Sequence, residues 1–247
     1  ATLQEPEHGL SEQRRAEIDE QRLNDFVGRV VGEIGATLNT ALVAIGDRLG
    51  LYRAMAGAGP LSSHALAEKT GTRERYVREW LNAQAAGGFV AYEPETGRYE
   101  LPPEQAFALA DDDSPAFVPG LFEVVLAALH DEPRIAEDFK DGKGVGWHEH
   151  HHGLFRGTER FFRPAYNANL VGSWIPALTG MEERLRAGAR VADVGCGHGA
   201  STILMAQAYP ASTFVGFDYH DESIATARRR AADGQPRRPR RHVAGHG

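Results

Sequence analysis

The segment Val191-Ala-Asp-Val-Gly-Cys-Gly-His-Gly199 decides the fold of this 247-residue chain. Val191–Val194 predict a short buried strand, and Ser201–Ala208 predict the helix that follows it. The three glycines between them allow a turn with backbone angles that other residues disfavour, and they let the backbone approach a ligand closely. A strand, a glycine-rich turn and a helix in this order predict the opening unit of a nucleotide-binding α/β sheet.

Asp193 indicates what this turn binds. Its carboxylate can receive a cationic amino group, whereas it would repel a pyrophosphate in the same place. The spacing Gly195-x-Gly197-x-x-Ala200 also fits the dinucleotide-binding pattern, but that pattern usually has an apolar residue where Asp193 stands. A dinucleotide site and a purely structural turn stay open as alternatives.

A second acidic residue follows the next predicted strand. Residues 212–217 have the strand pattern, and Asp218 comes directly after them, 19 residues beyond Gly199. An acidic side chain at the carboxyl end of this strand can accept two hydrogen bonds from ribose hydroxyls. The alternative is that Asp218 caps the helix that follows.

Composition limits the class of protein. A hydrophobic content of 42% and a charged content of 25% are ordinary for a soluble chain long enough for two modest domains. No apolar run approaches the roughly 18 residues that span a bilayer, and a net charge of -7 argues against general affinity for nucleic acids or anionic membranes. The single cysteine, Cys196, excludes an internal disulfide and predicts a cytoplasmic setting, with the thiol as a small filler or a reactive group.

The amino-terminal part predicts a charged arm followed by a winged helix. Residues 1–25 are highly charged, and residues 11–24 of this arm are predicted to be helical. Residues 26–103 predict an amphipathic helix with a break near Gly50, then two short helices separated by Gly71, then a hairpin of two strands. A helix-turn-helix followed by a hairpin is a winged-helix domain.

The capping residues and strand limits of this domain are predicted from local signals. Ser62 or Ser63 supplies the N-cap of the first short helix, and Thr72 supplies that of the second. The strands of the hairpin are expected at residues 87–92 and 98–101.

The charges of the predicted winged helix oppose DNA binding. Residues 60–101 contain five basic and six acidic residues, whereas a recognition helix normally carries several net positive charges. Glu74 and Glu79 lie on the helix that would enter the groove. Dimerisation or the building of a substrate pocket is therefore favoured, and DNA binding is the alternative.

Residues 104–180 predict a helical linker or lid that contains a histidine-rich loop. The loop Gly142–Gly153 includes His148 and the run His150–His152. Imidazoles ligate zinc and nickel, but consecutive loop residues rarely converge on one ion, so no metal site is predicted. One histidine could instead deprotonate an acceptor hydroxyl, or the loop could be a polar segment that closes beside the pocket.

The D-x-G-x-G order of residues 193–197 resembles motif I of class I S-adenosylmethionine-dependent methyltransferases. The winged helix and the Trp147-His148 loop extend the resemblance to small-molecule methyltransferases with an amino-terminal winged helix. The resemblance covers about Thr37 to Gly234. It implies an α/β fold in which residues 181–234 form the first β-α-β-α part of a Rossmann-like sheet. It also implies S-adenosylmethionine as the cofactor, a small-molecule methyl acceptor and a homodimer.

The resemblance further implies the residues of a cofactor site. Asp193 and the first two glycines would hold the methionine end of S-adenosylmethionine, Asp218 the ribose, and Tyr219 the adenine edge. No catalytic base is assigned. The complete predicted set is Asp193, Gly195, Cys196, Gly197, Gly199, Asp218 and Tyr219. Three residues that precede the sheet would close one side of the site by position: Tyr166, Asn167 and Trp174.

The sequence departs from this family after residue 234. A class I methyltransferase sheet has seven strands, and only two are predicted after Gly188. Residues 235–247 are rich in arginine and proline without a strand pattern, which predicts a disordered basic tail, a nucleic-acid tail, or the product of a frameshift or truncated gene. A truncated sheet would have an open edge, and this chain could then be catalytically inactive.

The principal prediction is therefore methyl transfer from S-adenosylmethionine to a small molecule. The main alternative is a winged-helix transcription regulator that retains a degenerate methyltransferase domain. A non-catalytic dimerisation protein is the third.

Overall fold

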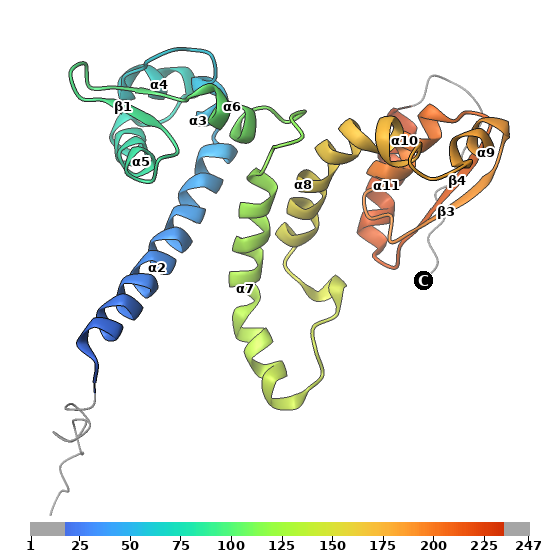
Figure 1. The fold of residues 1–247 in the computed structure, drawn as a ribbon, viewed down its shortest axis with the longest axis horizontal. Helices are drawn as coiled ribbons and strands as arrows, with labels where there is room; N and C mark the ends of the chain where they lie inside the picture. The colour runs from blue at the N-terminus through green and yellow to red at the C-terminus, as the bar shows by residue number, and fades with distance from the viewer. Residues whose placement is uncertain (1–17, 235–247) are drawn as a thin grey trace, which may run out of the picture. The chain divides into compact units, whose positions relative to one another are not determined.

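The structure, a computed structural model, describes residues 18–234 (Figure 1). It contains two compact units, residues 1–39 and 40–247, and each is described by itself. The described part of the first unit is formed mainly by α2 (Glu20–Arg48), a 29-residue helix that continues into the second unit. Residues 11–17 of the predicted amino-terminal helix lie outside the described residues. The predicted basic tail, residues 235–247, also lies outside them.

The second unit opens with a winged helix. Gly50 ends the first long helix at φ 70°, and Gly71 ends α4 at φ 64°, both in the left-handed region that favours glycine. Ser62 Oγ accepts a hydrogen bond from the Ala65 N–H at 3.2 Å and so caps α4. The predicted helix-turn-helix and hairpin are confirmed. After the end of α2, the elements are α3 (Leu51–Met55), α4 (Ser63–Thr70), α5 (Glu74–Ala86), β1 (Ala91–Glu93) and β2 (Arg98–Glu100).

Two details of this domain differ from the prediction. Thr72 is not the N-cap of α5: its Oγ1 lies 2.8 Å from Thr70 Oγ1, and the N-cap position falls on Arg73, which makes no side-chain cap. The strands are also shorter than expected, because the backbone N–H groups of Gly87 and Gly88 bond back to the end of α5 and prolong its last turn.

The winged-helix core forms around aromatic rings. Tyr52 is fully buried, and its hydroxyl donates a hydrogen bond of 2.5 Å to Gln84 Oε1. The ring of Trp80 lies edge-on to Tyr52, with ring centres 5.0 Å apart, and its Nε1 donates to the Leu42 carbonyl oxygen at 2.8 Å. Burial of these polar atoms is tolerated because each has a partner.

A helical linker follows, as predicted. Its two long helices lie side by side (Figure 1). They approach closely at glycines: a Cβ at Gly120 would lie only 2.5 Å from the Gly157 carbonyl oxygen. The linker elements are α6 (Pro103–Leu109), α7 (Pro119–Asp141), the 3₁₀ turn η1 (Trp147–Glu149), α8 (Gly153–Asn169) and the π-helical turn η2 (Leu170–Trp174).

The last part of the chain is the predicted β-α-β-α unit. Its two strands pair in parallel, with Ala192 opposite Val215. Phe214, Leu185 and Tyr209 are buried against the helices around them. The elements are α9 (Met181–Ala187), β3 (Arg190–Val194), α10 (Ala200–Ala208), β4 (Thr213–Phe217) and α11 (Asp221–Asp233).

The first strand of this sheet is less buried than the sequence predicts. The side chains of β3 alternate between exposed and half-buried, and Val194 is 83% exposed. Among the residues that the structure describes, β3 pairs only with β4, and Val194 at its end lines an open cleft. The strand assignment is confirmed, and the prediction that it is buried is wrong.

No helix in residues 18–234 is both long and apolar enough to cross a lipid bilayer.

Gly46 provides a test of the winged-helix core. A Cβ at this position of α2 would lie 2.7 Å from the Tyr52 ring and still closer to Trp80. We expect Gly46→Ala to lower the free energy of unfolding by about 1–3 kcal/mol, because overpacking a buried site forces its neighbours to move. Urea unfolding followed by tryptophan fluorescence measures this change.

Gly28→Ala is the matched control, since a Cβ at Gly28 has no neighbour within 4 Å. Alanine should stabilise this exposed helical position by about 0.5–1 kcal/mol. Equal stability of the two variants would contradict the packing described for Gly46.

Candidate functional site

The glycine-rich turn has the conformation that its sequence predicts. Gly195, Gly197 and Gly199 have φ angles of 79°, 53° and 77°, all in the left-handed region. The N–H groups of Gly195 and Cys196 both donate to the Phe217 carbonyl oxygen, at 2.7 and 3.0 Å. The turn is therefore tied to the carboxyl end of the neighbouring strand.

Asp193 points toward the start of α10. One of its carboxylate oxygens, Oδ2, accepts hydrogen bonds from the hydroxyls of Ser201 at 2.8 Å and Thr202 at 2.5 Å. Both donors are neutral, so the carboxylate keeps its full negative charge. The structure thus holds an oriented anion beside the glycine turn, with Oδ1 available to a cationic donor.

Asp218 has a structural role, but it does not cap the helix that follows, because the N-cap position of α11 (Asp221–Asp233) falls on His220. Its Oδ2 accepts the Gly197 N–H at 2.9 Å, and its Oδ1 accepts the His220 N–H at 2.9 Å. It therefore connects the glycine turn to the segment that leads into α11. Each oxygen has a second lone pair, so these bonds leave capacity to accept from a ligand.

A cleft of about 620 Å³ lies above the turn. This volume is typical of small-molecule sites, which measure about 300–1,000 Å³. One wall is the glycine turn with Asp193 and Asp218, and the opposite wall is α8, which contributes the rings of Phe155, Phe162 and Tyr166. All the predicted cofactor-binding residues line the cleft except Gly199, which is buried behind it.

Charges in the cleft are predominantly negative. Glu159, Asp193 and Asp218 line it, and its lining contains no lysine or arginine. Arg230 Nη1 lies 2.7 Å from Glu159 Oε1 and largely neutralises that carboxylate. Proximity to Asp193 adds to burial in raising the pKa of Tyr166. Two uncompensated carboxylates therefore remain, at Asp193 and Asp218.

Sequence reasoning missed several lining residues, and two of them carry ionisable side chains, His198 and Glu159. His198 lies within the glycine turn, and its Nδ1 is buried without a hydrogen-bond partner among the described residues. Burial and the nearby Arg230 lower the pKa of His198, so the ring is neutral at pH 7. Glu159 lies on α8, far from the motif, and its ion pair with Arg230 connects that helix to α11. The sequence could have predicted that His198 lines the cleft, because it lies within the glycine-rich turn. No sequence pattern indicates that Glu159 does.

The residues predicted to close the site are placed in different ways. Tyr219 is 58% exposed at the cleft, and its ring lies edge-on to His148, with ring centres 5.9 Å apart. Tyr166 lines the cleft, and Trp174 packs edge-on against Tyr166 at 6.1 Å. Asn167 is exposed and does not line it.

The histidine loop divides its side chains between two places. His148 contacts the cleft through Tyr219, whereas His151 and His152 line a different cavity on the other side of α8. His150 is held by Asp131, with its Nδ1 2.9 Å from Oδ2. In residues 18–234 no three histidine, cysteine or acidic side chains are arranged to hold a metal ion.

The described residues thus contain a winged helix, a helical linker and a β-α-β-α unit with a D-x-G-x-G turn, the elements that the resemblance to methyltransferases implies. Comparisons with known proteins agree. Residues 37–111 match the Rv2258c-like winged HTH domain, and residues 185–238 match a methyltransferase domain. The predicted recognition and fold class are confirmed: the chain combines a winged HTH domain with a methyltransferase domain.

Solved structures with the same fold are distant in sequence. A candidate O-methyltransferase from Nostoc punctiforme aligns with a TM-score of 0.61 and 20% identity, covering 83% of this chain and 60% of that one. Mitomycin 7-O-methyltransferase aligns with a TM-score of 0.58 and 16% identity, over 86% and 64%. Human N-acetylserotonin methyltransferase, solved with S-adenosylmethionine, aligns with a TM-score of 0.54 and 18% identity, covering 90% of this chain and 64% of that one.

The chain thus spans less than two thirds of the length of these structures. No curated protein matches it significantly.

Cys196 is buried in the turn, with 7% of its surface exposed. Burial, and then the carboxylates of Asp193 and Asp218, raise the pKa of its thiol to about 11, so the thiol stays protonated at neutral pH. This supports its interpretation as a small filler rather than a reactive group.

We expect iodoacetamide to alkylate Cys196 about a hundredfold more slowly in the native chain than in urea at pH 8, because the thiolate fraction falls tenfold for each unit of pKa. Intact mass spectrometry follows the reaction without ambiguity, since the chain has one cysteine. A native rate that levels off near pH 8, as for an activated thiol, would contradict the environment described here.

Proposed function

We propose that the cleft binds S-adenosylmethionine and that the protein transfers its methyl group to a small molecule. The observation that supports this most strongly is the charge of the cleft. Asp193 and Asp218 line it without a neutralising side chain, and no arginine or lysine does. S-adenosylmethionine carries a sulfonium and an ammonium, whereas a dinucleotide would bring a pyrophosphate against these carboxylates.

The predicted contacts fit the geometry of the site. Asp193 would receive the ammonium of the methionine end through Oδ1, and the left-handed glycines let the ligand approach the backbone. The ribose hydroxyls would donate to Asp218, and Tyr219 would lie against the adenine. The neutral imidazole of His198 also lines the cleft where the ligand would lie.

S-adenosylmethionine supplies a methyl group bonded to a positively charged sulfur. A nucleophilic atom of the acceptor attacks this carbon as the carbon–sulfur bond breaks, and the bonding electron pair stays on sulfur. The contribution of this chain is alignment: it holds the cofactor by its charged end and excludes water with the aromatic wall of α8. We infer that His148 serves an acceptor that must lose a proton, since its ring lies edge-on to the ring of Tyr219 at the cleft.

The solved structures also support a small-molecule acceptor. One of them is a mitomycin 7-O-methyltransferase and another is an N-acetylserotonin methyltransferase. Because this chain spans less than two thirds of their length, its activity and acceptor belong to the proposal.

A regulatory role through DNA binding is not favoured by the winged helix. Arg75 on α5 pairs with Glu79, and Arg78 lies 3.6 Å from Glu74. The arginines of this helix are therefore already matched by carboxylates one turn away, and few net positive charges remain for phosphates.

A cytoplasmic location is part of the proposal. The single cysteine is buried in the glycine-rich turn, where it fills space. A chain that uses cysteine in this way, without disulfides, is typical of a reducing compartment.

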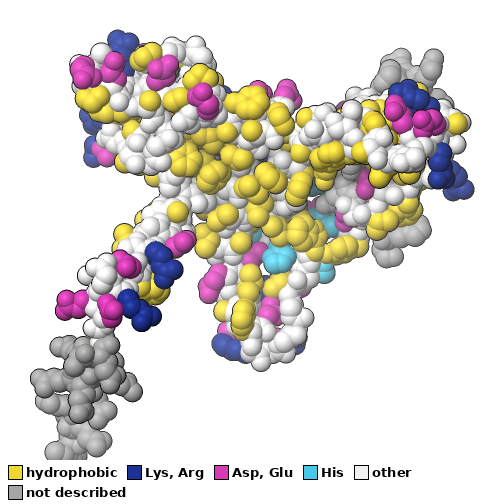
Figure 2. All heavy atoms as spheres, in the orientation of Figure 1, with side chains coloured by type: hydrophobic (Ala, Val, Ile, Leu, Met, Phe, Trp, Pro, Cys, Tyr) yellow, Lys and Arg dark blue, Asp and Glu magenta, His cyan; other side chains and the backbone are white. Residues whose placement is uncertain are grey.

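A homodimer is proposed from unpartnered apolar faces. On α2, large apolar side chains recur every three or four residues, and Val31 and Leu38 are 62% and 66% exposed. On α7, Leu121, Val125 and Leu129 form a second exposed stripe, and Figure 2 shows hydrophobic side chains gathered over this part of the linker. Faces of this kind are typical of association surfaces.

The cofactor proposal predicts that S-adenosylhomocysteine binds the chain with micromolar affinity in calorimetric titration. Asp193→Asn should weaken binding at least tenfold, about 1.4 kcal/mol, because the cationic end of the ligand loses its counter-charge. The amide oxygen can still accept from Ser201 and Thr202, so the variant should fold.

Asp221→Asn is the matched control, because Asp221 is exposed at the start of α11 and does not line the cleft. Equal affinity of the two variants, tighter binding of NADH than of S-adenosylhomocysteine, or no binding at millimolar ligand would each contradict the proposal.

The dimer proposal predicts that the parent chain sediments as a dimer at micromolar concentration. Val31→Glu should shift it to a monomer, since a charge buried at an interface is costly. Glu33→Gln on the same helix should leave the dimer intact. A monomeric parent chain in analytical ultracentrifugation would refute the proposal.

A further inference from the structure

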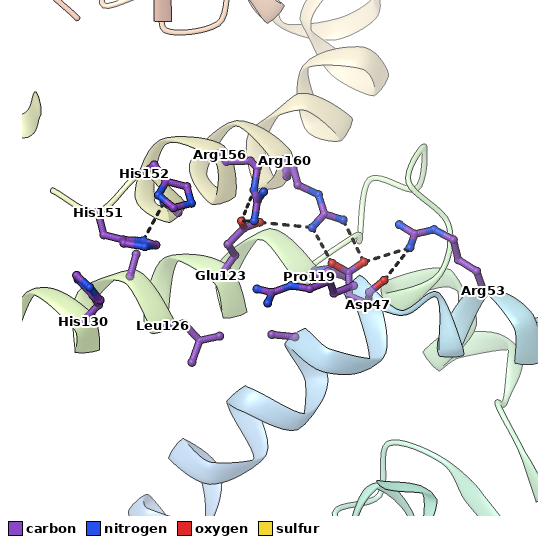
Figure 3. Close-up of a pocket in the computed structure, with 14 residues that line it drawn as sticks. Asp47, Arg53, Pro119, Glu123, Leu126, His130, His151, His152, Arg156 and Arg160 are labelled. Atoms are coloured by element: carbon purple, nitrogen blue, oxygen red, sulfur yellow. Dashed lines mark hydrogen bonds and ion pairs between the residues drawn. The ribbon is translucent and has the colours of Figure 1, made fainter. Parts of the chain in front are cut away.

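A second cavity, of about 690 Å³, lies on the other face of α8 (Figure 3). The α8 residues that line it are Gly153, Arg156 and Arg160, whereas Phe155, Glu159 and Phe162 are among those that line the methyltransferase cleft. At 100° per residue these two groups occupy different faces of the helix. The cavity is bounded on its other sides by the end of α2 and by α7.

Arginines dominate the lining of this cavity. Four arginines and two carboxylates line it, and Asp112 outside it pairs with Arg53 and Arg160. Even with Asp112 counted, one positive charge is in excess before any histidine is protonated. The side chain of Arg48 makes no hydrogen bond or ion pair with any residue in the range 18–234, so its charge is unmatched there.

Histidines extend the donor set at one end of the cavity. The rings of His130, His151 and His152 stand in a row, with successive ring centres 4.5 and 4.1 Å apart. The Gly153 N–H donates to His151 Nδ1 at 3.1 Å. This nitrogen is therefore unprotonated, and the ring proton of His151 resides on Nε2, which can donate to a ligand.

The electrostatic surroundings keep His151 neutral. Burial lowers its pKa first, and the neighbouring His152, His130 and Arg156 lower it further, against a smaller opposing effect of Asp131. At pH 7 His151 is thus a neutral hydrogen-bond donor in a cavity whose arginines are positively charged. The amino-terminal end of α8, a 17-residue helix, adds the positive end of its dipole at Gly153.

The rest of the wall is apolar. Ala44, Pro119, Leu126 and Ala127 line the cavity between the charged groups, and in Figure 3 Leu126 lies on the opposite side of Glu123 from Arg156. A ligand that fits this lining has one anionic group and one compact apolar group.

We propose that this cavity binds a small organic carboxylate with an apolar body, its carboxylate meeting Arg156, Arg48 and the histidines of the row. The site is separate from the cleft and does not depend on the methyltransferase proposal. Arg156 can serve both a ligand and Glu123, because a guanidinium has five donors and the Glu123 carboxylate also lies 3.5 Å from Arg160.

The test compares phenylacetate with phenylacetamide, a neutral probe of the same shape, in calorimetric titration of the full chain. We expect phenylacetate to bind, with phenylacetamide at least tenfold weaker, because only the acid can pair with the arginines. Saturating S-adenosylhomocysteine should leave phenylacetate binding in place. Competition between the two would assign the probe to the cleft and overturn the proposal.

Two variants locate the site. Arg48→Gln and Arg156→Gln should each weaken phenylacetate binding severalfold. Lys140→Gln removes a positive charge from the exposed end of α7 and should change nothing, since within residues 18–234 Lys140 pairs only with Glu137. If Arg156→Gln fails to fold, Arg48→Gln decides, since its side chain is exposed and unmatched within the described range.

Several results would overturn the proposal. Equal binding of acid and amide would show that the arginines are not used. Equal weakening by Lys140→Gln would show that only general surface charge matters. No binding of phenylacetate at about 10 mM would show that the cavity does not take carboxylates of this class.

Discussion

The ion pair between Arg160 and Asp47 connects the helical linker to the winged helix. Nη1 of Arg160 lies 2.7 Å from Asp47 Oδ2 and Nη2 lies 3.1 Å from Oδ1, a two-point contact between α8 and the end of α2 (Figure 3). The hydrogen bonds to Asp47 raise the pKa of Arg160 above its usual value, and they outweigh burial, which acts in the opposite direction. The two side chains are only 19% and 10% exposed, so solvent screens this pair less than an ion pair on the open surface. The orientation of α8 therefore depends on this contact.

The position of α8 in turn shapes both cavities. One face of the helix supplies the aromatic wall of the cleft, and Glu159 on that face pairs with Arg230 of α11. The opposite face carries Arg160 toward the winged helix. A single helix is thus tied to the β-α-β-α unit on one side and to the winged helix on the other. The winged helix can therefore influence the cleft although none of its residues lines it.

Sequence patterns predicted the local structure well and the tertiary contacts poorly. The glycine turn and Asp218 were identified because a short motif specifies backbone angles and strand ends. Exposure of Val194 was missed, since an apolar residue in a strand signals burial only if another element covers it. Arg160 and Asp47 are 113 residues apart, and no periodicity relates them. Glu159 likewise enters the cleft only through the packing of α8.

The two faces of α8 border surroundings of opposite charge. The cleft carries unmatched carboxylates, and the cavity carries an excess of arginine. A helix with its side chains is about 10 Å across. Two unit charges at that separation interact by about 1.7 kcal/mol at an effective dielectric constant of 20. An anion in the cavity would therefore favour a cation in the cleft. The coupling has this sign through charge alone, without any movement of the helix between them.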